Sequence, residues 1–446
     1  MNLKILTPLS LLVLLSINGC SLKSPQAQAK GKTHSAGPEA QLPQTKTGRS
    51  AQFYKMKVTQ DPENYFAQNA LAGYYLKLVR ETGDHGFLSL AEKAAKASLQ
   101  ALPARGNPGG LAALAQVYAG SHQFKQAKVL ALELVELAPH KSYPLEILGD
   151  VSLELGDYEA AQIAYEKAKS FGANASIETR LGRLSWLKGQ PIAAERHFTR
   201  ALAFAQDGKL DPQVIAWCHW QLGDSAFSRH SYQLARVHYK NSLKEQPDYI
   251  QSLASLGRLD AAEGKLSSAI ALYEKVINID PMPVFVAALG DLYLMNGQKD
   301  MAERSYKSVI DGERNEVDSR LDNRQLISVY ADHDVKASEA YQSAVAEFID
   351  RKDIYGADAV AWTALKAGKL KEADEAMTLA LKLKTRDAKL YYHAGMIDKA
   401  SGKDRKAIAN LRFALEINPN FDPFQAQIAR NTLSELLSKK VGVTKN

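Results

Sequence analysis

The chain has 446 residues, of which 46% are hydrophobic and 24% are charged, and its formal net charge is +7. This net charge is modest for the length, and Lys and Glu are interspersed without a long block of like charges, which argues against nucleic-acid binding. The chain contains only two cysteines, so a disulfide framework is excluded as the basis of its stability.

The N-terminus has the features of a secretory targeting segment. After Lys4, residues 5–17 form an apolar run that is shorter than the roughly 20 residues an ordinary transmembrane helix needs. The run leads to Gly19-Cys20, and this end resembles the lipobox of bacterial lipoproteins, in which the cysteine is acylated. The resemblance implies that residues 1–19 are removed as a signal peptide and that Cys20 carries a lipid anchor such as palmitate. An ordinary signal peptide followed by an incidental cysteine is the alternative.

Residues 20–50 are expected to form a flexible tether that begins at the lipidated cysteine. They consist mostly of Lys, Gln, Ser, Gly, Pro and Ala, and their only large apolar residues are Leu22 and Leu42, so they cannot bury a core. A flexible segment of this length reaches about 30 Å. Ser21 rather than Asp follows Cys20, and the resemblance to lipoproteins of Gram-negative bacteria then implies anchoring at the periplasmic face of the outer membrane.

The rest of the chain is organised by a Leu-Gly pair that recurs at a period near 34 residues, which is typical of a helix–turn–helix solenoid. A first apolar segment carries the pair, and a second carries Ala and Tyr at helical spacing. The small residue lets the two helices approach closely while the Tyr fills the gap beside it. The pairs are Leu148-Gly149, Leu181-Gly182, Leu222-Gly223, Leu256-Gly257 and Leu289-Gly290.

This pattern of Leu-Gly, Tyr, Ala, aromatic, Ala and Pro resembles the tetratricopeptide repeat. The resemblance implies an all-α, right-handed superhelical solenoid of about ten helical hairpins over residues 51–420. The eighth unit, near residues 326–348, lacks the glycine and fits the pattern least well. Residues 421–446 are expected to form an amphipathic capping helix followed by a basic tail, because a stacked array needs a polar end.

We found no catalytic motif of known spacing in the sequence. Phosphate loops, Gly-x-Gly-x-x-Gly, His-Glu-x-x-His, Cys-x-x-Cys and Gly-x-Ser-x-Gly are all missing. His219, His333 and His393 lack neighbours that would complete a metal site, and Cys218 is expected to be a buried small hydrophobe. We therefore expect no catalytic residues, no metal and no cofactor, and we expect the protein not to be an enzyme.

Helix geometry places a candidate ligand groove. Because each residue turns the helix by about 100°, the residues six and three before the glycine and one and four after it share one stripe. By resemblance to tetratricopeptide arrays, this stripe lines the concave surface. It carries all four tryptophans, which are suited either to anchor a ligand or to fill the space between helices. The groove candidates are Arg183, Trp186, Trp217, Trp220, Asp224, Phe227, Tyr355, Asp358 and Trp362.

The sequence therefore predicts a membrane-tethered scaffold for protein–protein interaction. We expect it to serve the assembly or export of an envelope complex or polymer, by holding a protein or peptide partner in the groove. The family resemblance covers lipoproteins of pilus assembly, outer-membrane assembly, peptidoglycan association and exopolysaccharide export. A module that binds polysaccharide or peptidoglycan through the tryptophans is one alternative, and an unrecognised enzyme is another.

Overall fold

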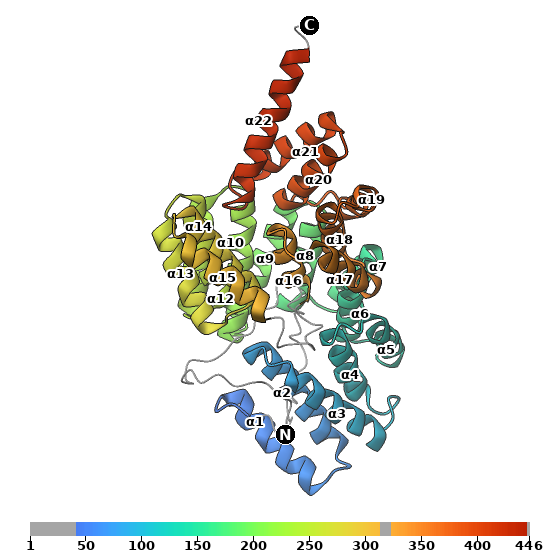
Figure 1. Cartoon of the computed structure of the whole chain (residues 1–446). Coiled ribbons are helices and arrows are strands. Elements are labelled where there is room, and N and C mark those ends of the chain that lie inside the picture. Colours follow the sequence, from blue (N-terminus) through green and yellow to red (C-terminus); the bar gives the residue numbers. More distant parts are fainter. Residues whose placement is uncertain (1–41, 313–322, 444–446) are drawn as a thin grey trace. The chain divides into compact units, whose positions relative to one another are not determined.

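The computed structural model describes residues 42–312 and 323–443, and every regular element in these ranges is a helix (Figure 1). The predicted all-α solenoid of helical repeats is therefore confirmed. The expected signal peptide (residues 1–19), the lipidation site Cys20 and residues 444–446 lie outside the described residues. None of the described helices combines the length and the apolar character needed to cross a membrane.

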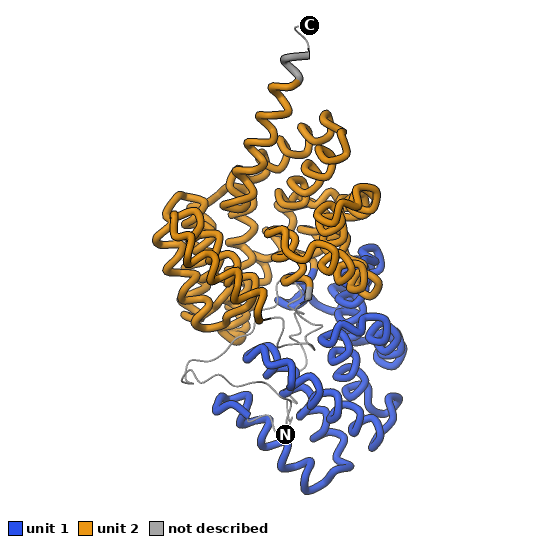
Figure 2. The backbone as a smooth tube through the Cα atoms, in the orientation of Figure 1, with its two compact units in different colours: residues 1–180 blue, residues 181–446 orange. Residues whose placement is uncertain are grey.

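The chain divides into two compact units, residues 1–180 and 181–446 (Figure 2). Helix α8 (Ala175–Leu187) contains the division. The other helices of the first unit are α1 (Lys46–Gln60), α2 (Tyr65–Thr82), α3 (Gly86–Ala101), α4 (Pro108–Gly120), α5 (Phe124–Leu137), α6 (Tyr143–Glu154) and α7 (Tyr158–Lys169). Helix α1 begins inside the segment that the sequence suggested as a tether.

The second unit holds the longer part of the array. Its helices after α8 are α9 (Pro191–Asp207), α10 (Pro212–Ser228), α11 (Tyr232–Glu245), α12 (Ile250–Ala262), α13 (Leu266–Ile279), α14 (Pro283–Met295), α15 (Lys299–Gly312), α16 (Asn323–Asp332), α17 (Ala337–Asp350), α18 (Ile354–Lys366), α19 (Leu370–Ala380), α20 (Ala388–Ala400), α21 (Asp404–Ile417) and α22 (Gln425–Val443). From α2 to α21 the described helices form ten consecutive hairpins, which agrees with the predicted number of units.

The packing inside a hairpin depends on the glycine of its first helix. A Cβ atom added to Gly257 would lie 2.7 Å from the Tyr273 ring, too close for two carbon atoms to remain in place. The glycine therefore lets an aromatic ring of the second helix lie directly against the backbone of the first, as the sequence predicted. The same contact joins Gly149 to Tyr165, Gly182 to Phe198, Gly223 to Tyr239 and Gly290 to Tyr306.

The turn inside a hairpin also depends on particular residues. Gly156 follows α6 with a φ of +74°, a left-handed conformation that glycine adopts without strain. Asp157 comes next, and its Oδ1 accepts a hydrogen bond of 3.2 Å from the backbone N–H of Ala160. This bond satisfies a free donor in the first turn of α7, so Asp157 acts as its N-cap.

Two sets of contacts join helices of the second unit that are far apart in sequence. Thr385, which is fully buried between α19 and α20, donates a hydrogen bond from Oγ1 to the carbonyl of Leu187 at the end of α8. Asn418, after α21, donates from Nδ2 to the carbonyl of Phe227 in α10, at 2.8 Å. The second unit therefore closes on itself, because its last hairpins contact its first ones.

The last helix begins later than predicted. The sequence suggested a capping helix from about Phe421, whereas α22 starts at Gln425. Asp422 sets this start, because its Oδ1 accepts from the backbone N–H of Phe424 at 2.9 Å and of Gln425 at 2.7 Å. Leu436, on the apolar side of α22, packs in the same hydrophobic cluster as Leu411 of α21, as expected of a capping helix.

We predict that Gly257→Leu strongly destabilises the protein. The new side chain must displace the Tyr273 ring, and such overpacking costs about 1–3 kcal/mol or more. Lys265→Ala is the control, because its side chain is 58% exposed and bonds only to nearby Glu263 in the turn, so the change should stay within about 0.5 kcal/mol. Thermal melts of both variants test this, and an unchanged melt for Gly257→Leu would show that the helix register is wrong.

Candidate functional site

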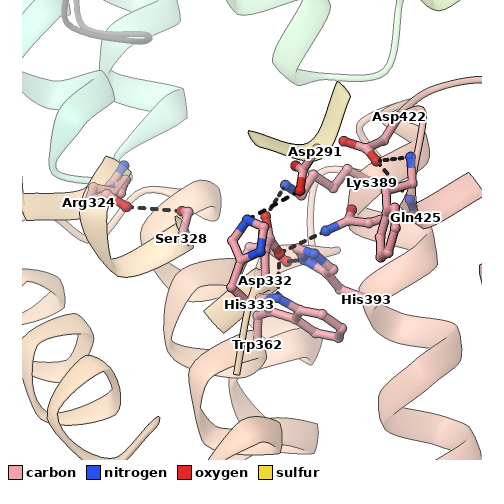
Figure 3. A network of polar contacts seen from close by, with 12 residues as sticks. Asp291, Arg324, Ser328, Asp332, His333, Trp362, Lys389, His393, Asp422 and Gln425 are labelled. Atoms are coloured by element: carbon pink, nitrogen blue, oxygen red, sulfur yellow. Dashed lines mark hydrogen bonds and ion pairs between the residues drawn. The ribbon is translucent and has the colours of Figure 1, made fainter. Parts of the chain in front are cut away.

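Polar side chains from three helices of the second unit, α18, α20 and α22, converge on the carboxylate of Asp332 (Figure 3). Asp332, the last residue of α16, accepts at Oδ1 from Trp362 Nε1 of α18 and from Gln425 Nε2 of α22, each at 2.8 Å. Its Oδ2 lies 2.9 Å from Lys389 Nζ of α20. We call these groups, with Asp291, His333, Asp358, His393 and Asp422 around them, the Asp332 network.

The charges in the network are balanced at its centre. Burial alone would raise the pKa of Asp332, but the positive charge of Lys389 and its hydrogen bonds outweigh burial and hold that pKa below its ordinary value. Lys389 in turn has a raised pKa, since the attraction of Asp332 and Asp422 outweighs its desolvation. Both groups are therefore ionised at neutral pH, and the pair joins α16 to α20.

Asp291 of α14 is less well compensated. Burial, together with the neighbouring carboxylates Asp422 and Asp332, raises its pKa to about 7, against the opposing hydrogen bond from Tyr306. His333 Nε2 lies 3.7 Å from Asp291 Oδ1, but burial lowers the pKa of His333, so this imidazole is mostly neutral at pH 7. Asp291 is thus the carboxylate of the network that gains or loses a proton near neutral pH.

A stacked pair of rings borders the network. His393 lies against Trp362 with the ring centroids 4.1 Å apart and the planes at 11°. Its Nδ1 lies 2.8 Å from Asp358 Oδ1, while its Nε2 is buried and has no hydrogen-bond partner among the residues that the structure describes. His393 thus contacts two of the predicted groove residues, Trp362 and Asp358. A third residue of the same helix, Tyr355, bonds to Asp387 at 3.3 Å.

The carboxylate after the repeat glycine has a recurring role that the sequence analysis missed. Tyr239, which packs on Gly223, donates a hydrogen bond from its hydroxyl to Asp224, the residue after that glycine, at 2.6 Å. Tyr165 bonds Asp150 and Tyr306 bonds Asp291 in the same way, each at 2.8 Å. The signal was present as Leu-Gly-Asp in three repeats, each followed by a Tyr.

Arginines complete two of these carboxylate sites. In the first unit, buried Arg180 places Nη2 2.7 Å from Asp150 and Nη1 3.2 Å from Glu146. Burial still raises the pKa of Asp150 to about 6. In the second unit, Arg258 Nη2 lies 2.8 Å from Asp224. These charges are used to join neighbouring repeats.

The groove residues on α10 lie inside the protein in this structure. Trp220 is 6% exposed, and its Nε1 donates to Ser255 Oγ of α12 at 3.1 Å. Phe227 is 3% exposed beneath the guanidinium of Arg258, which lies 4.3 Å from the ring centroid. Trp217 is buried edge-on against Phe198.

Helix α8 contributes the remaining two candidates. Trp186 is half-buried and hydrogen-bonds the side chain of Tyr355, and Arg183 is also half-buried. The structure contains no exposed aromatic patch made of Trp186 and the three aromatic side chains of α10. Trp217 packs against Phe198 of α9, and Trp220 and Phe227 contact side chains of α12. Ligand binding by these residues stays a prediction.

The cysteine and the histidine of α10 are both buried and are not activated for chemistry. Cys218 is buried, as expected, and burial raises the pKa of its thiol to about 12, so it is protonated at neutral pH. His219 Nδ1 lies 3.2 Å from His238 Nδ1, and burial lowers the pKa of His219 to about 4. In the part of the chain that the structure describes, no three His, Cys, Asp or Glu residues are arranged to hold a metal ion.

Comparison with known proteins agrees with the repeat pattern. The model of the tetratricopeptide-repeat family matches residues 145–171 and 388–421, which cover one hairpin in each unit. No curated protein matches the chain.

Several solved structures are similar in fold. PilW, a type IV pilus biogenesis factor, is 19% identical, with 50% of this chain and 97% of PilW covered and a TM-score of 0.41. PilF of Pseudomonas aeruginosa is 18% identical, with coverages of 48% and 93% and a TM-score of 0.40. The Cut9–Hcn1 hetero-tetramer of the APC/C is 12% identical, with coverages of 88% and 96% and a TM-score of 0.32. At these scores the likeness carries no functional argument.

We predict that Trp220→Ala lowers the stability of the protein by about 3–5 kcal/mol, the usual cost of removing a buried large aromatic side chain. Phe424→Ala is the control, since Phe424 is 42% exposed and its loss should cost much less. Denaturant unfolding of both variants measures the difference. A Trp220→Ala protein as stable as the parent would mean that this side chain faces solvent.

We predict that Asp291→Asn stabilises the protein at pH 8 and has little effect at pH 4. A raised pKa means that the folded state holds the proton more tightly than the unfolded state, so stability falls as pH rises from about 4 to about 7. The Asn side chain does not ionise, so the stability of the variant should not fall in this way. Since Asp291 is 26% exposed, we expect a gain of about 1–2 kcal/mol.

Melting curves across this pH range measure the effect of Asp291→Asn. Asp300→Asn, an exposed change in the neighbouring helix α15, is the control and should show no such pH dependence. A parallel response of the two variants would contradict the assignment of the raised pKa to Asp291.

Proposed function

Because the chain is a tetratricopeptide-repeat protein, we propose that it is a membrane-tethered scaffold that binds protein partners in the bacterial cell envelope. The recurrence of helical hairpins through ten units, five consecutive ones joined by a glycine–aromatic contact, supports the scaffold role. Each hairpin buries its apolar side against its neighbours, so such an array gains a long surface rather than one deep pocket. Long surfaces of this kind suit the capture of another polypeptide.

The N-terminal segment supports the envelope location. The apolar run at residues 5–17 is of signal-peptide length, and Cys20 stands where a lipid-bearing cysteine is needed. Acyl chains on this residue would hold the protein at a membrane, since each buried methylene adds about 0.8 kcal/mol. On this proposal the protein works at the periplasmic face of the outer membrane, in the assembly or export of an envelope complex or polymer.

A polysaccharide-binding groove has weaker support. Stacking on a sugar requires an exposed aromatic face. Trp217, Trp220 and Trp362 are each less than a tenth exposed, and Trp186 is half-buried. The protein-binding scaffold is therefore the function that the geometry supports best.

We predict that Cys20→Ser moves the protein from the membrane fraction to the soluble periplasmic fraction of a Gram-negative host, because the thioether that carries the lipid can no longer form. The parent chain should take up labelled palmitate and the variant should not. Cys218→Ser is the matched control, since Cys218 is buried and should leave fractionation unchanged. A mature chain that starts at Leu22 or later without lipid would disprove the anchor.

The scaffold role itself is tested by capture from native envelope. The tagged, full-length protein is cross-linked in cells and purified from detergent-solubilised membranes, and a matched sample of the destabilised variant Gly257→Leu serves as the control. We expect one or more envelope proteins to depend on the folded array. Recovery of the same proteins at the same level with both forms would argue against the proposal.

A further inference from the structure

Helix α1, the first helix of the described array, has an outward face that combines cations with apolar side chains. Because each residue turns a helix by about 100°, Lys46, Arg49, Phe53, Met56 and Lys57 fall within about 100° of one another. All five residues are exposed, and the exposed fraction is 51% for Phe53 and 53% for Met56. We call these five residues the α1 face.

The α1 face lies opposite the side on which the helix is packed. The buried residues of α1 are Thr47, Gly48 and Ala51, and they lie about 180° away around the helix. The chain that leads into α1 also lies on the packed side, because Gly48 leaves room for the carbonyl of Pro43. Since α1 is the first helix among the described residues, no earlier described repeat covers the α1 face.

The charge of α1 has one sign. Its 15 residues include four Lys or Arg and no Asp or Glu, and the first carboxylate after it is Asp61, beyond the end of the helix. The ammonium group of Lys57 lies 5.1 Å from the centroid of the Phe53 ring, so a cation and an aromatic ring occupy the same part of the surface. Arg49 donates from Nη1 to the carbonyl of Gln44 at 3.0 Å and stays exposed.

This combination of residues fits one kind of surface. The end of a solenoid needs a polar outer side in water, so two large apolar side chains there are unfavourable unless something covers them. Helices that carry cations beside aromatic and aliphatic residues lie in the interface of a bilayer. Their apolar side chains then reach the acyl boundary, and their cations meet the phosphates of anionic lipids. Four charges in 15 residues exclude a helix that spans the bilayer.

We propose that the α1 face docks on the surface of an anionic phospholipid bilayer. This inference rests on the lipid-anchored scaffold proposed above, because the residues between Cys20 and Lys46 reach about 30 Å and so keep α1 close to the membrane. A basic amphipathic helix alone binds weakly and reversibly, whereas an acyl anchor and a basic surface together give stable attachment. Docking would orient the first unit with α1 toward the bilayer.

The first test places a fluorescent probe on α1 of the full-length, lipidated protein. Gln60→Cys is labelled with nitrobenzoxadiazole, because Gln60 is exposed on the same side of α1 and Cys218 is buried. The protein is reconstituted into vesicles of phosphatidylethanolamine and phosphatidylglycerol. We expect the emission to shift to the blue and to be quenched by lipids that carry a spin label near the headgroup. Emission as in water would overturn the proposal.

Gln126→Cys is the matched control for the probe. Gln126 is an exposed residue of α5 in the same unit. A probe at this position should emit as in water in the same vesicles. If both probes shift equally, the unit has no preferred orientation on the membrane and the α1 face is not its docking surface.

The second test removes the lipid, so that only the protein surface can bind. Full-length Cys20→Ser protein from the soluble periplasmic fraction is mixed with vesicles that can be sedimented. Lys46→Gln, Arg49→Gln and Lys57→Gln together should weaken its binding to phosphatidylglycerol vesicles at least about tenfold, because each Lys or Arg near an anionic surface contributes about fivefold. Vesicles of phosphatidylcholine alone should bind neither form. Equal binding to the two kinds of vesicle would contradict an electrostatic docking surface.

A second triple variant controls for the loss of net charge. Lys93→Gln, Arg105→Gln and Lys167→Gln remove the same number of Lys and Arg charges from exposed positions elsewhere in the first unit. In the Cys20→Ser background this protein should bind phosphatidylglycerol vesicles as tightly as Cys20→Ser alone. If both triple variants lose binding equally, net charge rather than the α1 face explains the result, and the proposal is overturned.

The outcomes separate this inference from the proposed function. If the mature parent chain carries no lipid but still binds phosphatidylglycerol vesicles through the α1 face, the docking surface stands and the anchor is removed. If the lipidated protein keeps its Gln60 probe in water, the anchored scaffold stands and only the α1 face is removed. A probe that responds only when envelope proteins are added would assign the α1 face to a protein partner and overturn the proposal.

Discussion

The contact between a glycine and an aromatic ring is the constraint on which the rest of this structure depends. Because Gly149, Gly223 and Gly290 carry no Cβ, a tyrosine of the second helix reaches across the first helix. Its hydroxyl then meets the next residue of that helix, an aspartate in each of these three repeats. One close approach thus fixes both the distance between the helices and the position of a buried carboxylate. The polar contacts between repeats are built on that carboxylate.

The buried carboxylates differ in how each one is neutralised. Asp150 and Asp224 each have an arginine within 2.8 Å. Asp291 has the mostly neutral His333 at 3.7 Å instead, and burial raises the pKa of Asp291 to about 7. In the same hairpin geometry, burial therefore raises the pKa of the carboxylate to about 6 where Arg180 lies opposite Asp150, and to about 7 where His333 lies opposite Asp291. The neighbouring repeat contributes to this difference through the residue that it places opposite.

The parts of the structure that repeat were predictable from the sequence. Leu-Gly with a following Tyr predicted the hairpins, their number and the glycine contact. The assignment of Tyr355, Asp358 and Trp362 to a ligand groove stays a prediction. Burial of the tryptophans was not predicted, because it depends on which side chains of the neighbouring hairpins pack on them, such as Phe198 on Trp217 and Ser255 on Trp220. The contacts of Thr385 with Leu187 and of Asn418 with Phe227 have no period, so a repeat pattern contains no signal for them.

Closure of the second unit changes how this part of the chain is expected to unfold. An open solenoid adds stability one neighbour at a time, and its terminal repeats can fray without disturbing the others. Here the carbonyls of Leu187 and Phe227 are held by side chains from the last hairpins. Loss of the late repeats therefore leaves these two carbonyls without their side-chain donors. The two ends of the unit are expected to unfold together. Residues 181–446 are consequently closer to a single cooperative folding unit than to a string of independent repeats.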